Sequence, residues 1–96
     1  MRTIFNETTI FVGRQSRNFI IDVCYGCKYN GGKDSETQFT NEYKNLKAAE
    51  IMSGEEVEQF FHIGDNKDEY DEYLVLTLED GTKTVYQNSH VDMFHV

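Results

Sequence analysis

The sequence predicts one small α+β domain spanning residues 1–96: a mainly antiparallel, twisted sheet of about four or five strands, with one or two helices on one face. Three observations lead to this fold class. A chain of 96 residues suits a single core, and its 39% apolar and 14% aromatic content is enough to form one. Runs of β-branched and aromatic residues alternate with turn residues. One segment carries a helix-capping signature.

Two strands are expected in the first quarter of the chain. Residues 8–12 (TTIFV) are β-branched or aromatic throughout. Residues 17–24 follow a turn and alternate, which places Phe19, Ile21 and Val23 on one face. After the loop NGGKDS, a helix capped by Thr40 or Asn41 is predicted to run to about residue 52, with these residues on its inner face: Tyr43, Leu46 and Ala49.

A second, short helix is predicted from a capping box. Ser53 can accept from the Glu56 amide while the Glu56 carboxylate reaches back to the Ser53 amide. Met52 and Val57 are placed to form the hydrophobic staple around this cap. One apolar helix face is then expected, followed by Gly64 as the stop: Val57, Phe60 and Phe61.

A β-hairpin is predicted where Asp80-Gly81 separates two strand-like runs, residues 72–79 and 82–87. A two-residue turn would pair Glu79 with Thr82. It would also set Leu76 opposite Val85 and Val75 opposite Tyr86. The tail, residues 90–96, is expected to form a final strand or a short helical turn.

The charge is unevenly distributed along the chain. Residues 1–49 carry seven basic and five acidic side chains, a net of +2, whereas residues 50–96 carry two basic and twelve acidic ones, a net of −10. The run DNKDEYDE at residues 65–72 holds five carboxylates and one lysine. Such a run creates a negative field that attracts a positively charged partner and disfavours direct binding to nucleic acid or to an anionic membrane.

These carboxylates, with tyrosines between them, form the predicted partner-binding surface. Tyrosine is a favoured anchor at protein interfaces, so Tyr70 and Tyr73 are included as anchors. The predicted residues are Asp65, Asp68, Glu69, Tyr70, Asp71, Glu72 and Tyr73, with Glu55, Glu56 and Glu58 adjacent.

A zinc site is the alternative that the cysteines leave open. Cys24 and Cys27 have the C-x2-C spacing, and His90 and His95 have an allowed histidine spacing, so the four could hold a structural zinc. Two ordinary reduced cysteines are the simpler interpretation, because 62 residues separate the two pairs and the histidines would point to opposite faces of a strand.

Catalytic motifs are not apparent, so we expect no enzyme and no cofactor. His62 and Glu58 are spaced as a solvent-exposed (i, i+4) pair. The acidic run lacks the spacing and the internal glycine of a calcium loop, and neither a G-x-S-x-G nor a phosphate-loop motif occurs.

In size, acidity, α+β pattern and lack of catalytic motifs, the chain resembles the small phage-encoded inhibitors known as anti-CRISPR proteins, several of which imitate DNA with carboxylates. The resemblance implies a non-catalytic inhibitor that blocks a basic nucleic-acid-handling protein, such as a CRISPR effector or similar host defence complex. No signal peptide or membrane span is evident, so we expect it in the cytoplasm, that of the host cell if it is phage-encoded. A homo-oligomeric accessory domain that pairs through an edge strand is a further alternative.

Overall fold

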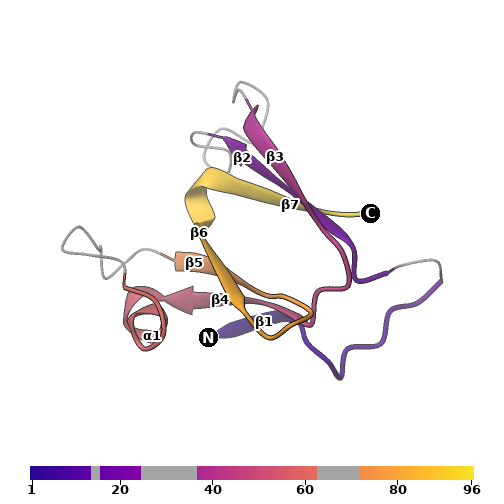
Figure 1. The fold of residues 1–96 in the computed structure, drawn as a ribbon, viewed down its shortest axis with the longest axis horizontal. Coiled ribbons are helices and arrows are strands. Elements are labelled where there is room, and N and C mark those ends of the chain that lie inside the picture. The colour runs from indigo at the N-terminus through magenta and orange to yellow at the C-terminus, as the bar shows by residue number, and fades with distance from the viewer. Residues whose placement is uncertain (14–15, 25–36, 63–71) are drawn as a thin grey trace.

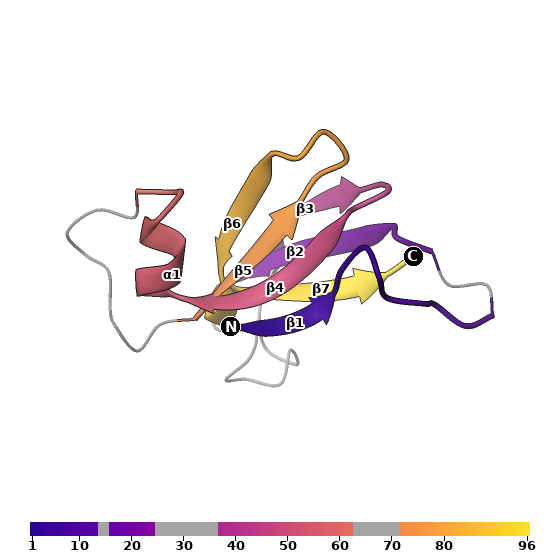
Figure 2. The same cartoon turned by 90° about the horizontal axis from the view of Figure 1, so that it is seen from below.

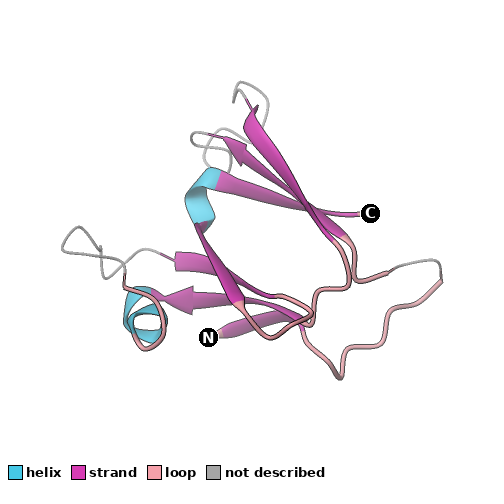
Figure 3. Ribbon diagram, in the orientation of Figure 1, coloured by secondary structure: helices cyan, strands magenta, loops and turns pink. Residues whose placement is uncertain are grey.

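The computed structural model describes residues 1–13, 16–24, 37–62 and 72–96, which form seven strands in two antiparallel sheets (Figure 1). The four-stranded sheet has the order β1 (Arg2–Phe5), β4 (Ala48–Ser53), β5 (Glu72–Thr77) and β6 (Lys83–Gln87). The three-stranded sheet has the order β3 (Thr37–Tyr43), β2 (Phe19–Cys24) and β7 (Val91–His95). The α+β prediction is confirmed only in part, because the domain is small and antiparallel but mostly β (Figure 3).

The core lies between the two sheets. The chain passes from one sheet to the other through residues 6–18, through residues 44–47, and through η1 (Asn88–His90), which joins β6 to β7 (Figures 1 and 2). Successive residues of a strand point to opposite faces, so every second side chain of each sheet faces the other sheet. The main core cluster is Phe5, Phe19, Ile21, Leu46, Ala49, Ile51, Leu74, Leu76 and Val91.

The strand predicted at residues 17–24 is confirmed as β2, the central strand of its sheet. Phe19 and Ile21 are buried, and Val23 packs against the same cluster, as the alternation predicted. Phe19 stacks on Phe5 of the other sheet, with ring centroids 4.7 Å apart. An apolar residue at every second position is therefore enough to orient this strand.

The helix predicted from residue 40 or 41 to about residue 52 is wrong. The segment forms the end of β3 and all of β4, with a turn between them at Asn45, whose φ is +56°. The side chain of Asn18 accepts a hydrogen bond from the Asn45 amide at 3.0 Å and so holds this turn. Leu46 and Ala49 are buried as predicted, but they reach the core from a turn and a strand because β4 is central in its sheet.

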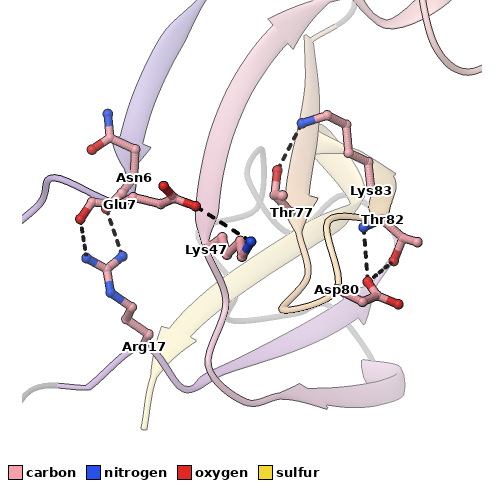
Figure 4. Close-up of polar contacts among 8 residues, drawn as sticks. All are labelled: Asn6, Glu7, Arg17, Lys47, Thr77, Asp80, Thr82 and Lys83. Carbon is pink, nitrogen blue, oxygen red and sulfur yellow. Dashed lines mark hydrogen bonds and ion pairs between the residues drawn. The ribbon is translucent and has the colours of Figure 1, made fainter.

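The strand predicted at residues 8–12 is also wrong. The segment is a loop that leads from β1 to β2, and its only inward side chain is Phe11, which packs against the main core. Arg17 holds the loop: its guanidinium lies 5.2 Å from the Phe11 ring centroid and donates 2.8 Å hydrogen bonds to the carbonyls of Asn6 and Thr9. Figure 4 shows Arg17 reaching this loop. The loop is therefore fixed by a side chain that the strand prediction did not consider.

The capping box is confirmed at the start of α1 (Gly54–Glu58). The Glu56 amide donates to the Ser53 hydroxyl at 3.3 Å, and the Ser53 amide donates to the Glu56 carboxylate at 3.2 Å. Met52 and Val57, the predicted staple, belong to a second core cluster on the outer face of the four-stranded sheet. That cluster is Met52, Val57, Tyr73 and Val75, with Val85 packed against it. Gly64, the predicted stop, lies outside the described residues.

The predicted hairpin is present as β5 and β6, but its register is shifted by one residue. Val75 is opposite Val85 and Leu76 is opposite Thr84, so the pairs predicted from a two-residue turn are wrong. The Leu78 amide donates to the Thr82 carbonyl at 2.8 Å, which leaves a three-residue loop with Gly81 at φ +90°. This arrangement is the hairpin loop in which a glycine follows a tight turn.

The tail forms both of the predicted structures in succession. Residues 88–90 make the short turn η1, and residues 91–95 make β7. β7 pairs with β2 from Phe19↔His95 to Val23↔Val91, which completes the three-stranded sheet. Among the described residues, no helix has the length and apolar character needed to cross a membrane.

Candidate functional site

Half of the predicted partner-binding surface falls within the described residues. The other half lies outside them: Asp65, Asp68, Glu69, Tyr70 and Asp71. The structure therefore bears on the ends of the acidic stretch, namely the helix before it and the strand after it.

The described acidic residues come together on and beside α1. In the pairing of β4 with β5, Glu72 is opposite Ser53, the N-cap of the helix. Glu55 is exposed in the first turn, where a carboxylate is favoured by the positive end of the helix dipole. Glu58 closes the helix. Local capping and strand register thus place carboxylates from both ends of the acidic stretch at the same end of the four-stranded sheet (Figure 1).

Two cations from the N-terminus reach these carboxylates. β1 pairs with β4 with Arg2 opposite Ile51, and this register brings the terminal ammonium within 3.3 Å of Glu56 and the Arg2 guanidinium within 4.0 Å of Glu72. Both pairs are exposed to solvent, so each contributes little to stability. They reduce the local negative charge without removing it.

Two other described cations of the first half, Arg17 and Lys47, are engaged elsewhere. Arg17 donates to backbone carbonyls of the loop after β1, and Lys47 lies 3.8 Å from Glu7 (Figure 4). In the part of the chain that the structure describes, the salt bridges from first-half cations to second-half carboxylates are those of the terminal ammonium and Arg2. The uneven charge seen in the sequence thus persists in the fold.

Glu56 differs electrostatically from its neighbours. Its carboxylate accepts the Ser53 backbone N–H and lies beside the terminal ammonium, and both interactions hold the pKa of Glu56 below its ordinary value. Glu56 is thus occupied by the cap, whereas Glu55 is exposed and Glu58 is half-buried beside His62.

The predicted pair of Glu58 and His62 is confirmed. His62 Nδ1 lies 3.4 Å from a Glu58 carboxylate oxygen, and the His62 side chain is 84% exposed. An imidazole so open to water lacks the partly dry surroundings that acid–base catalysis needs. The pair is a surface interaction within one helical turn.

Tyr73 is wrong as a surface anchor. It is 7% exposed and packs beneath α1 in the second core cluster. The alternation of β5 puts Tyr73 on the same face as Val75, and this face is the one that the helix covers. Tyr73 therefore stabilises the fold and does not present its ring to a partner.

Among the described residues, the exposed aromatic side chains that adjoin the acidic stretch are Phe60 and Phe61, which were predicted to lie on one apolar helix face. They are 42% and 48% exposed. The helix ends at Glu58, so only Val57 of the predicted apolar face reaches the core. Two adjacent phenylalanines just before an acidic run were the signal for an exposed aromatic pair. We call Glu55, Glu58, Phe60 and Phe61 the α1 surface.

Among the described residues, Lys83 places a cation against this aromatic pair. Its ammonium lies 5.6 Å from the Phe60 ring centroid and donates a 2.9 Å hydrogen bond to the Thr77 hydroxyl (Figure 4). β6 thus supplies a cation that packs on one of the two rings.

Two of the four proposed zinc ligands, His90 and His95, lie apart. His90 is in η1 and His95 is the last residue of β7, so they are separated by the length of a strand, at least about 13 Å at 3.3 Å per residue. His95 also stacks on Phe19, and its Nε2 accepts from the Ser16 amide at 2.8 Å. Ligands of one zinc ion lie about 2 Å from the metal, so these two histidines cannot share it. Cys27 lies outside the described residues, and no metal-binding cluster occurs within the described ones.

Protein-family models, curated proteins and solved structures gave no match to this chain.

The α1 surface combines carboxylates with exposed aromatic rings, and it directly precedes a stretch with four more carboxylates at residues 65–71. Such a surface can attract cations and can bind apolar or guanidinium groups.

Proposed function

We propose that this chain is a non-catalytic inhibitor that binds a basic, nucleic-acid-handling protein and blocks its nucleic-acid-binding surface. Its carboxylates take the place of nucleic-acid phosphates against the partner's arginines and lysines. The partner is a CRISPR effector or a similar host defence complex, as the resemblance to anti-CRISPR proteins suggests, and the inhibitor acts in the host cytoplasm.

The observation that supports this proposal most is the concentration of negative charge around α1. Four carboxylates lie on or beside the helix, at positions 55, 56, 58 and 72, and the described N-terminal cations offset two of them. The sequence adds four carboxylates and one lysine at residues 65–71. A field of this kind raises the association rate with a cationic surface and weakens as salt is added.

The fold gives this charge a firm support. Val57 anchors the inner face of the helix because its side chain is fully buried, and the capping box fixes the first turn. A rigid support lowers the ordering cost of binding, so more of the interaction energy appears as affinity.

Inhibition is tested directly by adding the purified protein to a panel of purified CRISPR effectors and measuring binding and cleavage of target DNA. We expect one effector to lose DNA binding, with recovery at higher DNA concentration because the two ligands compete. If the protein leaves DNA binding by every effector of the panel and phage resistance of cells that carry these systems unchanged, the assignment to CRISPR effectors is wrong.

The electrostatic mechanism is tested on the responsive effector with Asp68→Lys/Asp71→Lys. The matched control is Glu42→Lys/Glu79→Lys, which makes the same change of net charge at exposed positions away from α1. We expect the first variant to slow association at least tenfold at low salt, and the control to slow it about twofold or less. Equal association rates for the two variants would contradict a localised acidic surface.

A further inference from the structure

We infer that Phe60 and Phe61 are the anchors of the α1 surface and that Phe61 stacks on an arginine side chain of the partner. This inference rests on the proposed function and adds to it the chemistry of the partner's contact residues. It replaces Tyr73, which is buried.

The two rings project from a fixed backbone. The amides of Phe60 and Phe61 both donate to the Val57 carbonyl, at 3.1 and 2.8 Å, and Val57 is fully buried. Exposed aromatic rings on a rigid base bury a large area at a small cost in conformational entropy, the property that makes aromatic residues frequent anchors.

One ring of the aromatic pair already lies against a cation of the same chain. The Lys83 ammonium lies 5.6 Å from the Phe60 ring centroid, at a distance where the ring quadrupole attracts a positive charge. The Lys83 ammonium also donates to the Thr77 hydroxyl, which holds it over Phe60. Phe61 is therefore the ring that a partner's cation can reach.

Glu58 supplies a carboxylate close to the ring that remains. It precedes Phe61 by three residues, and the Phe61 amide donates to the Val57 carbonyl as in a helical turn, where residues three apart are neighbours. Glu58 now pairs with His62, an exposed side chain that a stronger cation can displace. A guanidinium group can stack its plane on an aromatic ring while its edge donates two hydrogen bonds to a carboxylate, which an ammonium group cannot do. The combination therefore favours arginine over lysine.

Charge complementarity identifies the occupant as a basic protein and not a second copy of this chain. Each copy carries a formal charge of −8, so two α1 surfaces would repel one another. An arginine-bearing surface instead meets both the carboxylates and the rings with favourable interactions.

The test compares two synthetic peptides of equal charge, nona-arginine and nona-lysine, by isothermal titration at low salt. The wild-type protein is expected to bind nona-arginine about fivefold more tightly. In Phe60→Leu/Phe61→Leu this preference is expected to fall to what the carboxylates alone give, while nona-lysine binding is unchanged. The matched control is Phe94→Leu, which alters a phenylalanine on β7 that is 49% exposed and is expected to keep the preference.

Equal affinities of the wild type for the two peptides, or a preference of undiminished size in the double variant, would overturn the inference. A second readout uses the unaltered protein: the ring proton resonances of Phe60 and Phe61 are expected to shift with nona-arginine more than with nona-lysine. The proposed function fails in a different way, namely if Asp68→Lys/Asp71→Lys binds both peptides as tightly as the wild type.

Discussion

The hydroxyl groups of Tyr43 on β3 and Tyr86 on β6 are hydrogen-bonded to one another across the interior of the domain. The two rings meet edge to face, with centroids 6.4 Å apart, and Asn41 donates a further 3.0 Å hydrogen bond to the Tyr86 oxygen. β3 and β6 are edge strands of different sheets, so this contact joins the two sheets by polar groups where the rest of the core joins them by apolar packing.

Removing the Tyr86 hydroxyl is expected to destabilise the protein more than removing the Tyr43 hydroxyl. Tyr43→Phe deletes the hydrogen bond to Tyr86 and should cost about 1 kcal/mol, whereas Tyr86→Phe deletes the partner shared by Tyr43 and Asn41 and should cost about 2 kcal/mol. Urea unfolding of both variants and of the double variant measures these values. The opposite order of stabilities would contradict the central position of Tyr86.

The same contact should make the protein sensitive to alkaline pH. Burial, followed by the hydrogen bond to Tyr86, raises the pKa of Tyr43 well above its ordinary value. The native protein therefore keeps a proton that the unfolded chain releases above pH about 10, so the free energy of unfolding should fall as the pH rises beyond that point. Unfolding curves between neutral and alkaline pH should show a smaller decline for Tyr43→Phe. An identical decline in the variant and the wild type would exclude Tyr43 as its source.

The capping box predicts a response to acid. Because the pKa of Glu56 is held below its ordinary value of 4.5, the stabilisation by its carboxylate is present above that value and is lost as the pH falls through the lower native pKa. In Glu56→Gln the free energy of unfolding should therefore fall less as the pH is lowered, which unfolding curves at several acidic pH values can measure.

At neutral pH, Ser53→Ala should cost about 1 kcal/mol through loss of the cap. Full stability of Ser53→Ala would show that packing of Val57 alone holds the helix.

Gly81 is expected to be necessary for its backbone conformation and not for lack of space. Its φ is +90°, and an added Cβ would meet no atom within 4 Å. Gly81→Ala should therefore cost about 1–2 kcal/mol from the left-handed backbone alone, and Gly81→Asn should cost less because asparagine tolerates that region better. Thermal unfolding of the two variants tests the order, and equal losses would point to a different cause.

Arginine at position 17 is expected to be irreplaceable by lysine. The guanidinium of Arg17 donates to the carbonyls of Asn6 and Thr9, and a lysine cannot form this fork. Arg17→Lys should cost about 1–2 kcal/mol and speed hydrogen exchange at the Thr9 amide, which donates to the Asn6 carbonyl at 3.1 Å. Lys44→Arg, at an exposed position, is the control. Unchanged exchange at Thr9 in Arg17→Lys would show that the loop is held without the fork.

Local signals in the sequence predicted local structure well. The capping box at Ser53 and the alternation of Phe19, Ile21 and Val23 are both present, because each depends on residues within a few positions of one another. The helix predicted after residue 40 failed for the opposite reason. The apolar spacing of Tyr43, Leu46 and Ala49 fits a helix, but pairing of β4 with two neighbouring strands outweighs that local preference.

The hairpin shows how a small local error propagates. Asp80 accepts from the Thr82 amide and hydroxyl, at 3.0 and 2.7 Å, which stabilises a loop of three residues where Asp-Gly alone predicts two. One additional loop residue shifts every pair of the ladder. The candidate site follows the same rule: the charge distribution could be predicted by counting residues, whereas the burial of Tyr73 and the exposure of Phe60 depend on where α1 ends.

The placement of β7 has a consequence for biosynthesis. β2 lies between β3 and β7, and its partners in β7 are more than 65 residues further along the chain. During translation β2 therefore lacks one of its two neighbouring strands until residues 91–95 have left the ribosome. Because pairings between such distant segments form slowly, the nascent chain passes through a period in which Phe19 and Ile21 are open to chaperones and to aggregation.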